Sequence, residues 1–501
     1  MKIRQFIIVV ILVIAIASPA YAEIKTFTET VKQTFGGSQS PDDARTAAIA
    51  KAKRNVLEKA GTYLESLTVV KDSKIDKDEI LALSAGILKV EVVSQKNFTE
   101  GDAFGIIIET KVDVDTSVLN ERIKTMLGDR ELMQKYTESQ KRETELLAKV
   151  KLLEEKNREL EKSNADEKQK AELKKEFKEN SQRIEAVGWF EKASSLWKDG
   201  KYSDPDNAIK YLNKALEIDP LFSTAYNNRG VAWYDKGDKE RAIQDYTSAI
   251  EQNPNFAGAY YNRGNAWSDK GEYDRAIKDY TNAIQINSSY AEAYCNRGNE
   301  WRMKGEFDIA MKDFTSAIGI NPSLAEAYYN RGLAWGMKGE FNNVINDFTR
   351  FIEINPSFAE AYSNRGIAWS GKGDYEQAIK DFTRAIEINP TLSEAYYNRG
   401  NAWSNKGEYV IAIKDFTKAI EINPTYADAY CNRGAAWGMN GELDIAIKDF
   451  THAITINPSL AVAYIGRGLM WAGKGDMGKA CLDFRKACNL GNCRGMEECK
   501  P

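Results

Sequence analysis

The stretch AYYNRGNAW at 259–267 decides the fold, because it returns unchanged at 395–403. Near copies of it stand at 225–233, 293–301, 327–335, 361–369 and 429–437. Each copy begins 34 residues after the one before it. Repetition at a fixed period of this length predicts small helical units that stack along the chain, because no single unit can bury its apolar face alone.

The repeat fills most of the second half of the chain. A divergent first copy occupies 186–222, and a short tail follows the last copy at 495–501. The eight full copies between them are 223–256, 257–290, 291–324, 325–358, 359–392, 393–426, 427–460 and 461–494. We number the places of a copy from its first residue, so that place 1 of the first full copy is Ser223.

Each full copy has the pattern of two antiparallel helices. Most copies have Gly at place 8 and Ala at place 20, where small residues let two helices approach closely. The Gly at place 15, such as Gly339, is expected to end the first helix, and the later Pro, such as Pro356, to stop the second. Ser or Thr after this Pro, with Glu three residues on, predicts capping boxes at Ser323 with Glu326, Ser357 with Glu360 and Thr391 with Glu394.

This arrangement of small, aromatic, Gly and Pro places resembles the tetratricopeptide repeat family. The resemblance covers the nine copies at 186–494, and it implies a concave groove that binds a protein or peptide. We therefore predict a mainly α fold, a right-handed α-solenoid of tandem helix–turn–helix repeats. A small α+β domain and a coiled-coil or helical spacer precede it.

Place 6 is Asn in seven successive copies, and the resemblance implies that this place faces the groove. The run resembles the asparagine ladder of O-linked N-acetylglucosamine transferase, and a carboxamide offers one acceptor and two donors to a peptide backbone. The alternative is that Asn is simply common at this place in the family. The tyrosines at place 5 are expected to line the same groove. The predicted peptide-binding residues are Asn228, Asn262, Asn296, Asn330, Asn364, Asn398, Asn432, Tyr261, Tyr329 and Tyr397.

Place 7 is Arg and place 23 is Asp in all eight full copies, whereas the divergent copy has Lys192 and Tyr211 instead. A partly buried guanidinium needs a carboxylate or carbonyl groups around it. We therefore predict a structural Arg–Asp bond, within a copy or forward to the next one. Arg263 with Asp279 and Arg297 with Asp313 are two such sets.

Residues 1–22 have the pattern of a secretory signal peptide. Two basic residues precede an apolar run, and Ala20 and Ala22 fit a cleavage site before Glu23. The alternative is an uncleaved anchor helix. We expect an exported, periplasmic protein, with outer-membrane association or secretion as alternatives. The formal net charge of -4 does not predict a nucleic-acid partner.

Residues 23–118 are predicted to form the small α+β domain. Residues 24–35 read as a strand, a helix starts at Pro41, and alternating apolar residues near 88–92 and 104–114 predict a hairpin. The helix DARTAAIAKAKRNVLEKAG at 43–61 resembles the N-terminal module of flagellar assembly protein T and of small envelope lipoproteins. That likeness implies an envelope location and brings no catalytic residue.

Residues 119–185 are highly charged and are predicted to form a helical spacer. Apolar and Asn residues spaced 4-3-4-3-4 fit the seam of a coiled coil, which would make the protein a homodimer. The seam residues are Leu146, Val150, Leu153, Asn157, Leu160 and Asn164. A single solvated helix is the alternative.

Four cysteines stand close together near the end of the chain. In an exported protein, Cys481, Cys488, Cys493 and Cys499 predict two disulfides, with three possible pairings that the sequence does not distinguish. Zinc is the alternative use of these thiols. Cys295 and Cys431 are too far apart in the array to pair and are expected to stay free thiols. We expect no metal and no cofactor.

The sequence has no phosphate-binding loop, no nucleophile elbow and no metal-ligand cluster, and its carboxylates recur in every copy. This favours a non-enzymatic scaffold of the bacterial cell envelope that binds an extended protein or peptide segment in the groove. The alternative is a structural assembly factor of a flagellar, pilus or secretion apparatus. It would use the N-terminal module and the coiled coil to join an envelope complex.

Overall fold

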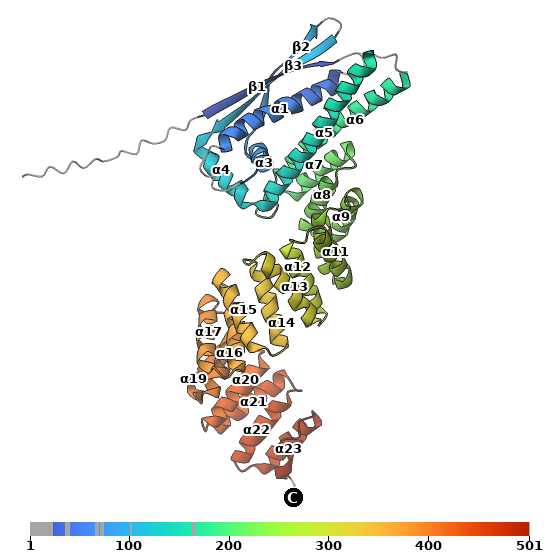
Figure 1. Cartoon of the computed structure of the whole chain (residues 1–501). Helices are drawn as coiled ribbons and strands as arrows, with labels where there is room; N and C mark the ends of the chain where they lie inside the picture. Colours follow the sequence, from blue (N-terminus) through green and yellow to red (C-terminus); the bar gives the residue numbers. More distant parts are fainter. Residues whose placement is uncertain are drawn as a thin grey trace, which may run out of the picture. The chain divides into compact units, whose positions relative to one another are not determined.

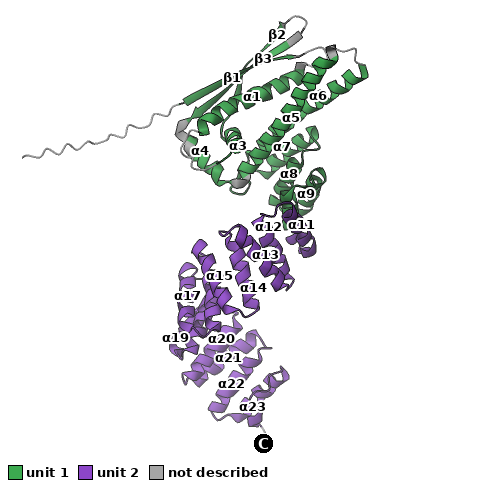
Figure 2. Ribbon diagram, viewed as in Figure 1, with its two compact units in different colours: residues 1–266 green, residues 267–501 purple. Residues whose placement is uncertain are grey.

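The computed structural model describes residues 24–35, 41–65, 70, 75–100, 103–162 and 167–499. The predicted signal peptide at 1–22 lies outside the described residues. The chain divides into two compact units, residues 1–266 and residues 267–501 (Figure 2). None of the described helices is both long enough and apolar enough to span a membrane.

The first unit begins with a three-stranded antiparallel sheet in the order β1-β3-β2. Its strands are β1 (Ile24–Phe35), β2 (Val90–Glu100) and β3 (Ala103–Asp115), and helix α1 (Pro41–Glu65) lies along the sheet (Figure 1). The predicted first strand, helix and hairpin are therefore confirmed. Helix α3 (Lys77–Ile87), which begins with a capping box between Asp76 and Glu79, was not predicted from the sequence.

Alternation along β3 explains why α1 covers one face of the sheet. Ile106 and Ile108 point to the same side and pack with Val31 of β1 against the alanines of α1. Thr110 continues this buried row as its one polar member. Its hydroxyl donates to the backbone oxygen of Ala52 at 3.1 Å, which satisfies the buried group.

The helices that follow the sheet are not a separate spacer. Helices α4 (Thr116–Gly128), α5 (Arg130–Lys162) and α6 (Glu167–Ser194) belong to the first unit. Three of the predicted seam residues, Leu146, Val150 and Leu153, are buried in a cluster with Phe177 and Ile184 of α6. The seam is thus filled within one chain at these three places, and the structure does not support a coiled-coil homodimer through them. Asn164 lies outside the described residues.

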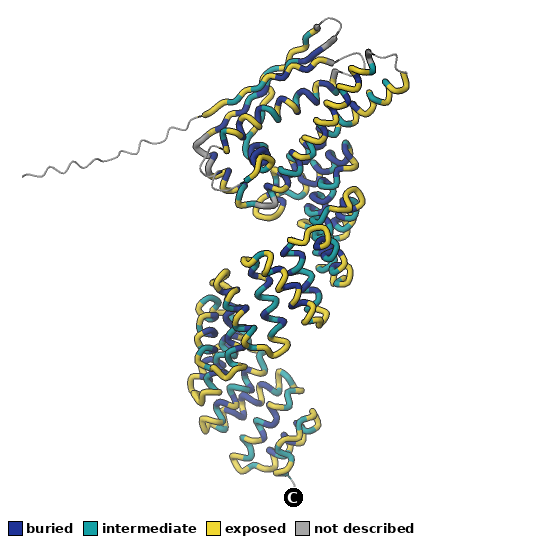
Figure 3. The backbone as a smooth tube through the Cα atoms, in the orientation of Figure 1, coloured by how far each residue is buried: buried dark blue, intermediate teal, exposed yellow. Residues whose placement is uncertain are grey.

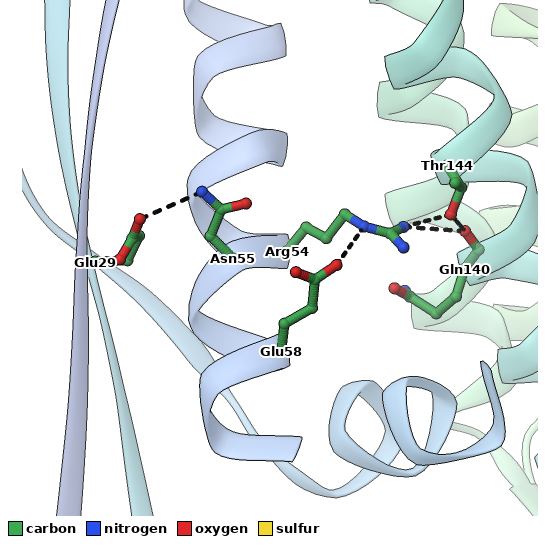
Figure 4. Close-up of polar contacts among 6 residues, drawn as sticks. All are labelled: Glu29, Arg54, Asn55, Glu58, Gln140 and Thr144. Atoms are coloured by element: carbon green, nitrogen blue, oxygen red, sulfur yellow. Dashed lines mark hydrogen bonds and ion pairs between the residues drawn. The ribbon is translucent and has the colours of Figure 1, made fainter. Parts of the chain in front are cut away.

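Polar contacts fix α1 between the sheet and α5 (Figure 4). Arg54 of α1 donates to the hydroxyl of Thr144 on α5, and its Nε donates to Glu58 at 3.0 Å. On the other side of α1, Asn55 donates to Glu29 of β1 at 3.3 Å. The N-terminal α+β elements and α5 therefore form one compact body.

The repeats of the first unit start inside α6, so the predicted boundary at 185 falls within a helix. The second helix of the divergent copy is α7 (Pro205–Ile218), and a small hairpin precedes it, made of β4 (Trp197–Lys198) and β5 (Lys201–Tyr202). Helices α8 (Ser223–Asp235), α9 (Lys239–Gln252) and α10 (Ala257–Ser268) follow, and the division between the units falls inside α10.

The second unit is an array of helix pairs. Its helices are α11 (Tyr273–Ile286), α12 (Ala291–Met303), α13 (Phe307–Ile320), α14 (Ala325–Met337), α15 (Phe341–Ile354), α16 (Ala359–Gly371), α17 (Tyr375–Ile388), α18 (Ser393–Asn405), α19 (Tyr409–Ile422), α20 (Ala427–Met439), α21 (Leu443–Ile456), α22 (Ala461–Gly473), α23 (Met477–Asn489) and the short η1 (Met496–Cys499). Gly339 follows α14 with φ +74°, as predicted for a residue that ends the first helix. The mainly α fold of tandem helix pairs behind a small α+β domain is confirmed.

Close approach inside a pair explains the Gly at place 8. A Cβ atom added at Gly298 would stand 2.9 Å from the ring of Phe314, and one at Gly366 would stand 2.7 Å from the ring of Phe382. These aromatic rings at place 24 are almost completely buried, and Figure 3 shows the buried residues along the inner sides of the pairs. Any larger residue at place 8 would push the two helices apart.

The predicted capping boxes are wrong. The residue before α14 is Leu324, and it makes no side-chain cap. The hydroxyl of Ser323 donates instead to Oδ1 of Asn321 at 2.7 Å, and its backbone N–H donates to the same oxygen. The Asn-Pro-Ser sequence thus forms an Asx turn, which leaves Glu326 without a capping role.

The tail is tied to the last helix by two disulfides. Cys481 of α23 pairs with Cys499, with their Cα atoms 5.6 Å apart, and Cys488 pairs with Cys493. Gly495 lies against the ring of Phe484, so the tail covers apolar surface at the end of the array.

Candidate binding surface

The arginines at place 7 serve the fold. Arg297 donates to both carboxylate oxygens of Asp313 in its own copy, at 2.7 and 2.8 Å, and to the hydroxyl of Thr281 in the preceding copy at 3.1 Å. The same bidentate pair within a copy joins Arg229–Asp245, Arg331–Asp347, Arg365–Asp381, Arg399–Asp415, Arg433–Asp449 and Arg467–Asp483. The predicted bond is confirmed in these copies. Apart from Arg229, each of these arginines also links two copies through a threonine of the preceding copy.

Arg263 and Asp279 stand on opposite sides of the division between the units. Within the first unit, Arg263 donates to the hydroxyl of Thr247 at 3.0 Å, as its counterparts do in other copies. Arg229 donates to Asn213, whereas its counterparts donate to a threonine, because the helix before Arg229 belongs to the divergent copy.

The asparagines at place 6 bind the preceding copy. Nδ2 of Asn364 donates to the hydroxyl of Tyr329 at 3.4 Å, and Nδ2 of Asn432 donates to that of Tyr397 at 3.0 Å. Asn330 lies near the thiol of Cys295, and Nδ2 of Asn262 donates to Asn227 at 3.0 Å. In each case the amide reaches place 5 of the copy before it. These amides therefore stabilise the stacking of copies, a role that the sequence analysis missed.

The remaining predicted ladder residues differ in their surroundings. Asn398 follows a copy with the short Ser363 at place 5, and its side chain makes no hydrogen bond within the described part of the chain. Asn296 is half-buried. Asn228 is buried and is already occupied from within the first unit, because Nζ of Lys135 on α5 donates to its Oδ1 at 2.9 Å. It is therefore not available to a ligand in this state.

The tyrosines predicted to line the groove are half-buried at place 5. Tyr329 packs edge-on against Phe348 and Phe358, and Tyr397 packs against Tyr426. Burial raises the pKa of both phenols, so they stay neutral at physiological pH. Tyr261 is half-buried in the first unit. These rings contribute to the walls between copies and present only part of their surface outward.

Exposed apolar side chains line the first helices of the second unit. Place 9 and place 13 lie four residues apart and share a helix face with place 2 and place 5. We call this face the first-helix face. Its exposed apolar residues include Leu469, Ile367, Val462, Met303, Met439 and Met337, and the last of them is 70% exposed. The methionines at place 13 were missed in the sequence, although their spacing of four from place 9 would have found them.

Carboxylates occupy the same face at place 2. Glu292, Glu326, Glu360, Glu394 and Asp428 occupy this place in five successive copies. The side chains of Glu326 and Glu360 form no ion pair or hydrogen bond within the described part of the chain. The first-helix face therefore combines an apolar row with an acidic row, a surface suited to a segment that is both apolar and basic.

Cys295 and Cys431, the two cysteines outside the tail, are buried at place 5. Burial raises the pKa of each thiol to about 12, so both are neutral at pH 7 and poor nucleophiles. The structure thus places them as small apolar residues between copies.

One copy has a buried acid where the others have a small or apolar residue. Place 10 is Ala in six copies and Met470 in the last, but Glu300 in the copy 291–324. Glu300 is only 2% exposed. Its Oε1 accepts from the hydroxyl of Ser268 at 2.6 Å, whereas its Oε2 has no hydrogen-bond partner among the described residues. Burial raises the pKa of this carboxyl above its ordinary value.

Replacing Glu300 by Ala is expected to stabilise this part of the array by about 1–3 kcal/mol at pH 7.5, the cost of a buried unsatisfied polar group. A carboxyl with a raised folded-state pKa lowers stability as pH rises above its unfolded pKa, because the unfolded chain releases the proton while the folded chain still holds it. The gain should therefore be smaller at pH 5. Urea unfolding at both pH values, followed by hydrogen exchange of α12, measures the effect.

The exposed Glu326 provides the control, because Glu326→Ala on the next first helix should change stability by no more than about 0.5 kcal/mol at either pH. A loss of stability in Glu300→Ala would show that the bond from Ser268 outweighs the buried charge.

The repeats are similar in sequence to a known family. Two family models described as tetratricopeptide repeat match the chain, one at 223–256, 257–290, 359–392, 393–426 and 427–460, and the other at 186–220. No curated protein matches the chain.

Among solved structures, the chain is similar to YrrB, described as a TPR protein with an unusual peptide-binding site. It is 24% identical over 37% of this chain and 96% of that one, with a TM-score of 0.34. MamA is 30% identical over 34% of this chain and 94% of that one, with a TM-score of 0.32. PilW, described as a widely conserved type IV pilus biogenesis factor, is 16% identical over 42% of this chain and 97% of that one, with a TM-score of 0.38.

Proposed function

Because the chain belongs to the tetratricopeptide repeat family, we propose that it is a non-enzymatic scaffold of the bacterial cell envelope that binds a protein segment on the first-helix face of its second unit. The exposed row of Met303, Met337 and Met439 carries this proposal, because flexible apolar side chains left in water are typical of protein-binding surfaces. The envelope location rests on the signal-peptide pattern at 1–22.

The asparagine ladder has a smaller part in this proposal than the sequence suggested. An extended segment read by bidentate pairing would need the nitrogen and the oxygen of each amide. The nitrogens of Asn364 and Asn432 already bond the preceding copy. The amide oxygens, the apolar row and the carboxylates at place 2 are the groups that support binding.

A triple variant tests the surface. Changing Met303, Met337 and Met439 to Glu in the full chain adds three charges to the apolar row and is expected to reduce recovery of partners from envelope extract at least tenfold. Quantitative mass spectrometry of the captured proteins measures the recovery.

The matched control changes Ile309 and Ile445, which are exposed on second helices, to Glu. This variant should capture the same partners as the parent chain. If the two variants lose partners equally, the first-helix face has no special role and the proposal is wrong.

A further inference from the structure

The first unit already contains a helix bound to the first-helix face of a repeat. Helix α5 runs antiparallel to α8: Nζ of Lys135 donates to Asn228 at place 6, and seven residues later Arg142 lies 5.8 Å from the ring centre of Phe222, just before α8. Between them, Glu138 lies near Thr224 at place 2. Leu132 and Val231 of place 9 pack against the same buried cluster. Places 2 and 9, which α5 contacts on α8, belong to the first-helix face in the second unit, and place 6 lies beside that face.

One stripe of α5 makes all of these contacts. Leu132, Lys135, Glu138 and Arg142 are spaced three, three and four residues apart, which puts them on one side of a helix. The ammonium of Lys135 also lies 3.9 Å from the ring centre of Trp197, and Arg142 bonds the buried Asp219 at 2.7 Å. The charged groups of Lys135 and Arg142, together with the apolar side chain of Leu132, therefore hold this helix on the repeat.

Two neighbouring first helices of the second unit repeat the surface of α8, and on the second of them Ile367 is 46% exposed. Where α8 has Asn228 and Val231, α14 has Asn330 and Leu333, and α16 has Asn364 and Ile367. Of the full copies in the second unit that keep the asparagine, these two alone have a large aliphatic residue at place 9. At place 2 they have Glu326 and Glu360 in place of Thr224, so their charge favours a basic partner more strongly.

We propose that the face formed by α14 and α16 binds a helix of the partner that presents a stripe of Leu and Lys or Arg, in the way that α5 binds α8. The inference rests on the proposed function and names the class of partner: an amphipathic basic helix. Helix-in-groove binding of this kind uses apolar anchors on one stripe and charges at its edge for orientation. On the preceding first helix, α12, Arg302 donates to Oδ1 of Asn299 of its own helix at 2.8 Å.

The test uses a peptide of the chain's own sequence 130–147 as the probe, held helical by a lactam between Lys141 and Glu145, which are both exposed in α5. Fluorescence anisotropy of the labelled peptide is measured with the full chain. We expect saturable binding that weakens at least tenfold when Lys135 and Arg142 of the peptide are changed to Glu.

A variant of the full chain with Glu326→Lys and Glu360→Lys locates the site and should weaken binding of the parent peptide at least tenfold. Thr224→Lys on α8 is the matched control and should leave binding unchanged, because α5 already covers that place. No binding, or equal binding to the charge-reversed chain, would overturn the inference. If partners are still captured through the methionine row in that case, the proposed function stands with a ligand of another form, such as an extended segment.

Discussion

Asp219→Ala is expected to lower the free energy of unfolding of the first unit by about 3–5 kcal/mol, the cost of leaving buried charges unpaired. The side chain of Asp219 is fully buried. Its oxygens accept from Arg142 of α5 at 2.7 Å and lie 3.5 Å from Arg183 of α6. Since Asp219 follows α7, the carboxylate joins three helices of the unit. Urea unfolding with hydrogen exchange of α5 measures the loss.

Two control variants separate the charge from the shape of the side chain. Later copies have Asn at the equivalent place, and Asn321 accepts a backbone N–H there as Asp219 does from Leu221. Asp219→Asn keeps that bond but removes the charge, so it should lose most of the same stability. Asp206→Ala breaks the exposed pair with Lys236 and should cost no more than about 0.5 kcal/mol. Similar losses in Asp219→Ala and Asp206→Ala would show that the buried carboxylate does not hold α5 in place.

The role of α5 could not be predicted from the sequence, and the reason is physical. The spacing of Leu146, Val150 and Leu153 correctly identified an apolar helix face. Periodicity states which face of a helix is apolar, but it does not state what covers that face. The same pattern is expected whether a second chain or the chain's own α6 covers that face. Only the fold shows that α6 covers it, and that α5 in turn covers α8.

The structure of the repeats was more predictable than the role of α5, because a fixed period allows each residue to be compared with its equivalents in the other copies. The joint occurrence of Arg at place 7 and Asp at place 23 led to the correct bond. The same comparison did not reveal that Asn364 uses its amide on Tyr329, since contacts between copies depend on the stacking geometry. Glu326 was misread as a capping residue because Asn321 makes the turn before it. Because these acids have no capping role, the acids at place 2 are free to act on the first-helix face.

Asp313→Ala is expected to destabilise the copies around 291–324 by about 2–4 kcal/mol. The carboxylate is 5% exposed and holds Arg297 by two bonds, and its removal leaves a guanidinium without an acid in a largely buried place. The value lies below that for Asp219 because Asp313 is slightly exposed and pairs with one arginine, whereas Asp219 is fully buried and lies near two. Stability in an array is local, so the loss should appear first as faster hydrogen exchange in α12 and α13.

A double variant shows whether the pair acts through its charges. Arg297→Met with Asp313→Leu replaces both partners by apolar residues of similar size and should recover most of the stability lost in Asp313→Ala. Glu353→Ala, which breaks the exposed pair with Arg350, should change little. If Asp313→Ala unfolds as the parent does, the bidentate pair does not support the fold. The arginines at place 7 would then need another reason to be present in every full copy, and contact with a ligand would be the first to test.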